Sequence, residues 1–176
     1  MRFFAIRRPP REGGSLSLRA WFFTGAALLG IVIAFALLCR EQYRHGIPVD
    51  AGAWEEACPD TLLYDVSGYR DDAGYHLEGY AFIDGERLEW VDDFVALYHA
   101  GTGKYLRFPT LMVWSDAAAA RQSAADSRAG YAGFGAYAAP GSLAHPAGEY
   151  EVCLLYATNH HRILVHTGKT LQEAVS

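Results

Sequence analysis

The chain has 176 residues, of which 51% are hydrophobic and 20% charged, so it fits one ordinary domain with a short appendage and is not a disordered or low-complexity chain. Three cysteines are too few for a disulfide-dense scaffold, and a formal net charge of −5 argues against a nucleic-acid-binding protein. The charge is uneven, because residues 1–44 hold seven arginines and two acids whereas residues 45–176 hold eight basic and eighteen acidic residues. The basic amino-terminal segment and the acidic remainder of the chain are therefore expected to lie in different surroundings.

The first element in chain order is an apolar run at residues 20–39, which contains no charged side chain. Twenty helical residues span about 30 Å, the thickness of the hydrocarbon core of a bilayer. The run therefore predicts a transmembrane helix over residues 19–40, with Trp21 at the membrane interface. A cleaved signal peptide is the alternative, but its apolar core would be shorter and a small residue would precede Cys39.

Arginines set the expected orientation of this helix, since five precede it and two lie closely after it. The positive-inside rule then keeps the basic tail at residues 1–18 in the cytoplasm and exports residues 41–176. We expect a single-pass protein of the bacterial inner membrane, with a linker at residues 41–53 and a periplasmic domain at residues 54–172. Residues 173–176 are expected to form a tail.

The exported domain has the pattern of an all-β protein, because short runs rich in tyrosine and phenylalanine alternate with Gly, Pro and Asp clusters. Strands are predicted at residues 61–67, 74–83, 94–99, 104–108, 111–114, 131–138, 149–157 and 162–167. Residues 111–114 are read as a continuation of the preceding strand beyond Pro109, and residues 116–129 as a partly helical connection. About seven antiparallel strands in about 120 residues predict a two-sheet sandwich of the immunoglobulin or fibronectin III type.

One tyrosine supports the sandwich. Tyr150 comes after a turn and begins the penultimate strand, as the tyrosine of a tyrosine corner does, and its hydroxyl is expected to bond to upstream backbone. A period of two then predicts that Val152 and Leu154 face the core with Tyr150, while Cys153 faces outward.

The sequence allows two interpretations of Cys58 and Cys153, the two cysteines of the exported domain. They could form a disulfide that closes a loop of about 95 residues, which would contribute on the order of 4 kcal/mol in the chain-entropy model. They could equally be two free thiols. A catalytic cysteine is not expected, because no local motif supplies a base.

Neither a metal nor another cofactor is expected. His160, His161 and His166 occur at a turn and in the last strand, where adjacent side chains point in opposite directions and would not converge on one ion. The acidic residues at 71–72 and 84–93 are read as a solvated surface, with calcium binding as the alternative. The catalytic motifs GxSxG, HExxH and GxGxxG are absent from the sequence, and residues 101–104 are read as a hairpin turn.

The chain resembles small bacterial membrane-anchored β-sandwich modules that accompany cell-surface glycan biosynthesis. The resemblance rests on glycine, aromatic and turn positions between residues 74 and 156, which include Gly79, Tyr80, Phe108, Pro109 and Gly148. That group has an Arg-x-Asp element after its Pro-Thr pair, where this chain has Trp-Ser-Asp at residues 114–116. The resemblance implies an accessory or recognition role without a defined activity.

Aromatic side chains beside polar groups suit sugar rings, and they make the candidate binding residues of the domain. These candidates are Trp90, Tyr105, Arg107, Trp114 and Asp116. We therefore expect a non-enzymatic membrane protein whose β-sandwich recognises a partner protein or a surface glycan. One alternative is an envelope enzyme that acts on glycan through its acidic loops. Another is a subunit held on a membrane glycosyltransferase or transporter through its transmembrane helix.

Overall fold

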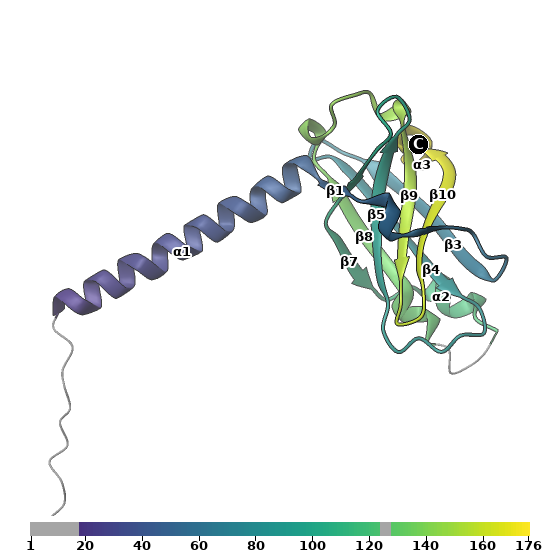
Figure 1. The fold of residues 1–176 in the computed structure, drawn as a ribbon, viewed down its shortest axis with the longest axis horizontal. Helices are drawn as coiled ribbons and strands as arrows, with labels where there is room; N and C mark the ends of the chain where they lie inside the picture. The colour runs from purple at the N-terminus through teal and green to yellow at the C-terminus, as the bar shows by residue number, and fades with distance from the viewer. Residues whose placement is uncertain (1–17, 124–127) are drawn as a thin grey trace, which may run out of the picture. The chain divides into compact units, whose positions relative to one another are not determined.

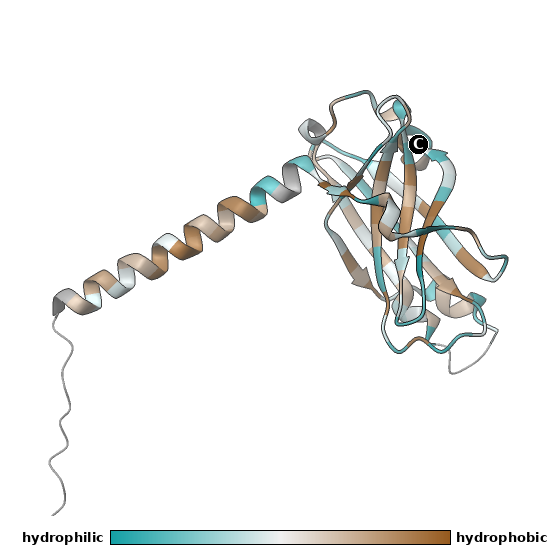
Figure 2. Cartoon of the chain, viewed as in Figure 1, coloured by the Kyte–Doolittle hydropathy of each residue, from teal (hydrophilic) through white to brown (hydrophobic). Residues whose placement is uncertain are grey.

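The computed structural model describes residues 18–123 and 128–176, and it divides into a helical unit that ends at Leu38 and a β-rich unit that begins at Cys39. Helix α1 (Leu18–His45) contains a 22-residue stretch, Ala20–Glu41, that is long and apolar enough to cross a membrane, as Figure 2 shows by its brown colour. The Thr24 hydroxyl donates to the Ala20 carbonyl (2.9 Å), which satisfies this polar group within the helix. The tail predicted at residues 1–18 lies, except for its last residue, outside the described residues.

The β-rich unit consists of two sheets, which confirms the all-β arrangement (Figure 1). The six-stranded sheet has the order β1-β6-β5-β9-β10-β2, and the four-stranded sheet has the order β3-β4-β8-β7. The strands of the larger sheet are β1 (Ile47–Val49), β6 (Lys104–Arg107), β5 (Asp92–His99), β9 (Tyr150–Ala157), β10 (Arg162–Thr170) and β2 (Glu55–Glu56). Those of the smaller sheet are β3 (Leu62–Arg70), β4 (Tyr75–Ile83), β8 (Gly133–Ala138) and β7 (Thr110–Val113).

The eight expected segments all form strands, but the described residues form ten strands in place of the predicted seven or so. Strands β6 and β7 do not form one continuous edge as expected, because β6 pairs with β5 in the larger sheet and β7 pairs with β8 in the smaller one. The break falls at Phe108 and Pro109. Proline has no backbone N–H and a fixed φ, so the ladder of β6 ends there and the chain crosses to the other sheet.

The predicted linker at residues 41–53 does not stay outside the fold. Its first part continues α1, and Ile47–Val49 then pairs antiparallel with β6 as strand β1. A short 3-10 helix, η1 (Ala51–Ala53), leads to β2, which pairs parallel with β10. Strand β1 has only three residues, one of which is an exposed proline, so it is too short to be predicted by itself. Its strand conformation depends on pairing with the edge of β6.

The core between the sheets confirms the predicted alternation on β9. Tyr150, Val152, Leu154 and Tyr156 all pack in the inter-sheet core. Cys153 points the other way, as expected, but it is also fully buried, because the segment of β1, η1 and β2 covers it from outside. The tyrosine-corner bond of Tyr150 is not among the hydrogen bonds that join described residues.

A second layer covers one end of the smaller sheet on its outer face. Helix α2 (Asp116–Arg121) and the 3-10 helix η2 (Ala129–Ala132) pack there around the buried Tyr80 and Phe82. The expected connection at residues 116–129 is thus helical at its start, and residues 124–127 lie outside the described residues. Ser115 caps α2 by accepting the Ala118 N–H (3.2 Å).

The remaining elements are short and lie just before β9 or just after β10 in the chain. Two 3-10 helices, η3 (Pro140–Ser142) and η4 (Ala147–Glu149), precede β9, and helix α3 (Leu171–Ala174) comes after β10. The predicted tail at 173–176 begins inside α3, because Thr170 and Glu173 form a capping box and Leu171 and Ala174 pack into the core.

One buried carboxyl group sits in the fold without a partner. Asp93 on β5 is 1% exposed, and both of its carboxyl oxygens lack a hydrogen-bond partner among the described residues. Burial, and secondarily the neighbouring Asp92 carboxylate, raises the pKa of Asp93 well above its usual value. The unfolded chain therefore releases this proton at a lower pH than the folded chain does, so the group reduces stability as the pH rises above about 4.

We predict that Asp93→Asn stabilises the full-length protein in detergent at pH 7 to 8 and that this gain shrinks towards pH 4. Thermal unfolding followed by circular dichroism at several pH values measures the effect. Asp92→Asn changes an exposed neighbour and is the control, with a much smaller expected effect. Parallel pH profiles for the wild-type protein and Asp93→Asn would contradict the prediction.

Candidate functional site

The exposed apolar side chains of the β-rich unit gather around one sheet. Six large hydrophobic side chains are exposed among its described residues, and each lies on the four-stranded sheet or on a segment beside its outer face. We call them the apolar strip: Tyr69, Trp90, Leu111, Val113, Trp114 and Tyr131. Exposed patches of this kind on a small domain commonly mark a binding surface.

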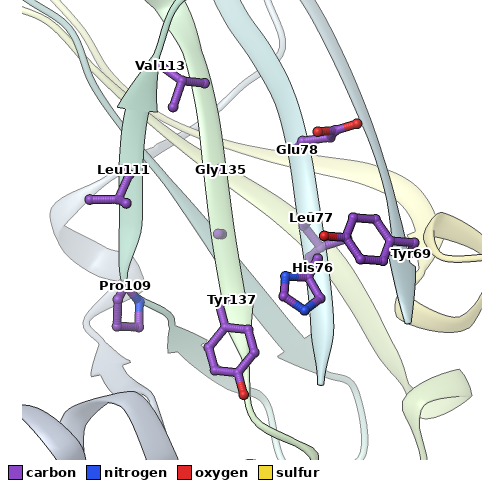
Figure 3. Close-up of a pocket in the computed structure, with 10 residues that line it drawn as sticks. Tyr69, His76, Leu77, Glu78, Pro109, Leu111, Val113, Gly135 and Tyr137 are labelled. Atoms are coloured by element: carbon purple, nitrogen blue, oxygen red, sulfur yellow. The ribbon is translucent and has the colours of Figure 1, made fainter. Parts of the chain in front are cut away.

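A groove runs along this outer face between β4 and β7, with Gly135 of β8 as its floor (Figure 3). The register places Gly135 directly between Glu78 on β4 and Leu111 on β7. A Cβ atom at Gly135 would meet no heavy atom within 4 Å, so the space above the floor is open. The hollow has a volume of about 270 Å³, with an apolar wall on the β7 side and a carboxylate on the β4 side.

Aromatic rings close one end of the groove. The Tyr69 and His76 rings are stacked (centroids 4.6 Å apart, planes 8° apart), and the Tyr137 ring lies 5.2 Å from the His76 ring. His76 is held by Asp71 in the β3–β4 turn (Nε2 to Oδ1, 3.2 Å), and the Tyr137 hydroxyl donates to the Ala73 carbonyl. These three rings therefore have fixed positions before any ligand arrives.

The apolar strip continues from the groove to the α2 and η2 end of the sheet. Glu78 and Val113 line both the groove and a neighbouring hollow that reaches Trp114. The Trp114 ring meets the Tyr131 ring edge to face at 5.0 Å, and its Nε1–H donates to Asp116 (2.7 Å). Gly130 lies directly under the indole, since a Cβ there would approach three of its ring atoms to 2.5–2.7 Å. The strip is therefore continuous from the groove to Tyr131.

A third hollow ends the strip. It measures about 600 Å³ and is lined by Trp90, Tyr131, Arg128 and residues of the β4–β5 connection. Trp90 is 48% exposed and comes from a different connection than Tyr131. Trp90 and Trp114, two of the candidate binding residues from the sequence, are thus exposed at this end of the sheet.

The five predicted binding residues divide into two groups. Trp90, Trp114 and Asp116 belong to the apolar strip or contact it. Tyr105 and Arg107 lie instead on β6, on the outer face of the larger sheet, where the Arg107 guanidinium stacks over the Phe94 ring (4.2 Å). These two residues support the packing of that face and are not part of the groove.

Tyr105 belongs to a half-buried polar cluster on the larger sheet. Its hydroxyl lies 3.1 Å from Nε2 of His166, whose Nδ1 lies 2.9 Å from Glu151 and 3.6 Å from Cys153 Sγ. Burial, followed by the charges of Glu151 and Glu56, raises the pKa of the Cys153 thiol far above its usual value. Burial also raises the pKa of Tyr105 to about 12. A buried protonated thiol is a poor nucleophile, so the burial of Cys153 argues against a catalytic role for its thiol.

The disulfide between Cys58 and Cys153 is not formed. Both residues are free thiols, with Cys58 exposed and Cys153 buried. The reason is the covering segment, because β1, η1 and Trp54 pack over the outer face of β9 and enclose Cys153 beneath them. The sequence allowed either a disulfide or two free thiols, and the structure has the free thiols.

The other candidate clusters are spread apart by the fold. Asp71 and Asp84 lie at opposite ends of β4, so the acidic residues around the first hairpin do not form one group. His161 pairs with Glu86 (2.9 Å), while His166 pairs with Glu151 on a different part of β10. His160 lies 2.8 Å from the Asn159 side chain, so these three histidines have different partners.

Comparisons of the chain with protein-family models, curated proteins and solved structures found no match. The function of the groove is therefore inferred from its geometry and chemistry alone.

Sequence reasoning missed most of the groove. Leu111 and Val113 alternate with Thr110 and Met112, so both faces of β7 look apolar and the period does not reveal which one is exposed. Gly135 carries no signal as a floor until β4 and β7 are placed on either side of it. Sequence reasoning also missed the cluster of His99, His145 and Glu149, because the pairing of β5 with β9 brings His99 beside the other two residues.

The state of the cysteines gives a direct test of the covering segment. In a Cys39→Ser background, we predict that Cys58 reacts rapidly with a maleimide without reduction and that Cys153 reacts only after unfolding. Mass spectrometry of the labelled peptides measures both sites. Labelling of neither cysteine before reduction would instead show the disulfide, and rapid labelling of Cys153 would show that its cover is open.

Proposed function

We propose that this protein is a membrane-anchored recognition module whose groove binds a neutral surface glycan. The observation that carries the proposal is the placement of all six exposed large hydrophobic side chains of the described β-rich unit around the outer face of one sheet. Sugar rings stack on aromatic faces through their C–H groups while their hydroxyls bond to nearby polar groups. The groove has both, with fixed rings at one end and Glu78 along one wall.

The charge of the domain favours a neutral ligand. Residues 45–176 carry ten more acidic than basic residues, and Glu78, Asp65 and Asp116 lie along or beside the strip. An acidic glycan would be repelled by this surface, whereas carboxylates accept hydrogen bonds from neutral sugar hydroxyls. The strip passes through three separate hollows, so it suits an extended chain of several sugar units better than a single one.

The strand order and the apolar helix fit the same proposal. The orders β3-β4-β8-β7 and β10-β9-β5-β6 match the A-B-E-D and G-F-C-C′ orders of immunoglobulin domains, which supports a sandwich of that type. Helix α1 would anchor the sandwich in the bacterial inner membrane, with the amino terminus in the cytoplasm and the sandwich in the periplasm. An accessory role beside a membrane glycosyltransferase or transporter would place the groove where glycan is made or exported.

The first experiment identifies the ligand. The full-length protein is purified in mild detergent, and bound glycan and protein are identified by mass spectrometry. Maltohexaose and chitohexaose then serve as neutral probes and oligogalacturonate as an acidic probe in a binding titration. Binding of a neutral probe supports the proposal. Binding of the acidic probe alone, or of a protein partner with no glycan, would overturn it.

Gly135 allows the groove to be tested without changing a wall residue. We predict that Gly135→Val, which fills the open space above the floor, weakens binding of the neutral probe at least about tenfold, or about 1.4 kcal/mol. Gly135→Ala should have an intermediate effect. Both variants should unfold at or above the wild-type temperature, because valine and alanine fit a strand better than glycine does. Unchanged affinity in Gly135→Val would place the ligand elsewhere.

A further inference from the structure

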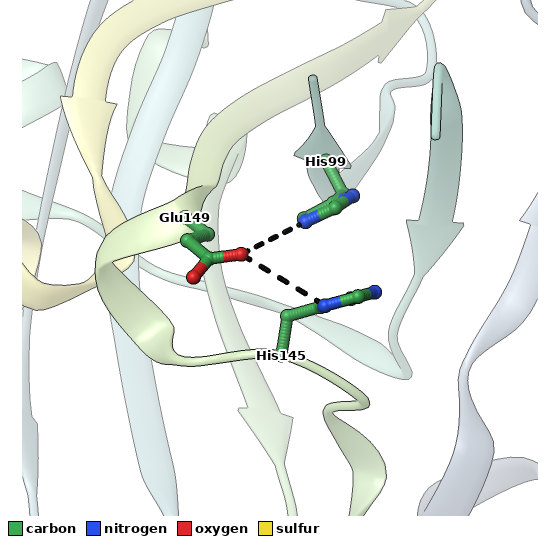
Figure 4. Close-up of side chains that lie close together, drawn as sticks. All are labelled: His99, His145 and Glu149. Atoms are coloured by element: carbon green, nitrogen blue, oxygen red, sulfur yellow. Dashed lines mark hydrogen bonds and ion pairs between the residues drawn. The ribbon is translucent and has the colours of Figure 1, made fainter. Parts of the chain in front are cut away.

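Three metal-ligating side chains converge at the end of the larger sheet, where His99 meets two residues that lie more than forty positions later in the chain. His99 ends β5, His145 lies in the segment before η4, and Glu149 ends η4 (Figure 4). The Glu149 Oε2 atom lies 3.2 Å from His99 Nε2 and 3.8 Å from His145 Nδ1, and one ligand atom from each residue lies within 4.8 Å of the others. Two ligands about 2.0–2.1 Å from a tetrahedral ion would be about 3.4 Å apart, so the spacing fits one ion.

The fold holds His99 in place before any ion binds. His99 is 7% exposed and faces Tyr150 across the β5–β9 ladder, which brings it beside Glu149. Gly101 in the β5–β6 turn packs against the imidazole, since a Cβ there would lie 2.9 Å from His99 Cε1. A rigid, buried first ligand is what a preformed metal site requires.

The hydrogen bonds around His99 leave a position for a cation. His99 Nδ1 lies 3.1 Å from the Thr102 hydroxyl oxygen, and Nε2 lies 3.2 Å from a Glu149 carboxylate oxygen. The Thr102 hydroxyl both donates and accepts, so it suits either tautomer of His99. When Nδ1 carries the proton, Nε2 presents its lone pair toward Glu149. Either a proton on Nε2 or a metal ion in its place lies between the two atoms.

Two imidazoles share one carboxylate at this place. The His99 and His145 rings lie nearly parallel, with centroids 3.9 Å apart and planes 13° apart, and both point a nitrogen at the same carboxylate. Two imidazolium ions stacked this closely would repel each other, so the rings do not both carry a charge while they are stacked. Two neutral imidazoles and one carboxylate are a donor set that a single divalent cation accepts.

We propose that His99, His145 and Glu149 bind one Zn²⁺ ion. Two histidines and one glutamate are a common zinc ligand set in which the fourth position stays open. The side chains of His145 and Glu149 are 41% and 54% exposed, so the fourth position faces solvent and takes a water molecule or an oxygen or nitrogen donor from another molecule. Because an ion lies in the plane of each imidazole that binds it, the exposed His145 ring tilts out of the stack when zinc binds. Thr102 acts from outside the ligand set and positions His99.

This site is independent of the groove. The ligands come from β5 and from the segment that leads into β9, which belong to the larger sheet, whereas the groove lies on the smaller sheet. Gly135→Val should therefore leave zinc binding unchanged, and loss of zinc binding says nothing about the glycan proposal.

The test uses the full-length protein in detergent after removal of metal with a chelator. We expect one equivalent of Zn²⁺ to bind in a calorimetric titration and to raise the unfolding temperature. Co²⁺ in its place should give the intense visible absorption of a four-coordinate site. His145→Ala and Glu149→Gln change exposed residues and should weaken Zn²⁺ binding by more than about a hundredfold, and Thr102→Val by about 10- to 100-fold. His160→Ala removes a different exposed histidine and should have no effect.

Three results would overturn the proposal. The first is no Zn²⁺ binding at all, which would leave a proton as the cation between His99 and Glu149. The second is unchanged binding in both His145→Ala and Glu149→Gln. The third is binding that is lost only in Cys153→Ser, which would assign the ion to the cluster of Glu151, Cys153 and His166. Circular dichroism and metal-free unfolding temperatures equal to those of the wild-type protein show that the variants fold.

Discussion

The burial of β9 on both of its faces is the constraint on which the rest of the domain depends. Its inner side chains fill the space between the sheets, and its outer side chains lie under the segment of β1, η1 and β2. β9 also lies in the middle of its sheet, where it pairs with β5 and β10. Because the chain's own segment lies over the outer face of β9, the groove and the histidine cluster lie elsewhere, on the outer face of the smaller sheet and at the strand ends.

Both candidate sites result from this arrangement. On the smaller sheet, α2 and η2 cover only one end of the outer face, so the rest stays open as the groove. At the end of the larger sheet, the β5–β9 ladder fixes His99 beside the turn that carries Glu149. The first site is a broad surface of modest polarity, and the second is a small polar cluster. They have different chemistry because one lies on a sheet face and the other at strand ends, where loops supply side chains from distant parts of the sequence.

The sequence was sufficient to locate most of the strands, because each is rich in β-forming residues and bounded by turn residues. It was not sufficient for β1 and β2, whose conformation comes from the neighbouring strands and not from their own residues. The same limit applies to the sites. Trp90, Trp114 and Tyr105 were equal candidates from the sequence, but the two tryptophans lie beside the smaller sheet, whereas Tyr105 lies on the larger sheet beside His166. Which sheet a residue joins is decided by the crossing at Pro109, and no local pattern records that choice.

The two glycines of β8 show how the fold divides structural from functional requirements. Gly133 has no room for a side chain, since a Cβ there would lie 2.6 Å from the Val113 carbonyl and 2.7 Å from Ser115 Cβ. It allows β7 to approach β8 closely and thereby holds one wall of the groove. Gly135, two residues later on the same face, has open space above it, so packing does not require a glycine there. A substitution there changes the groove and not the packing around it, which makes Gly135 a more informative position to change than the conspicuous tryptophans beside it.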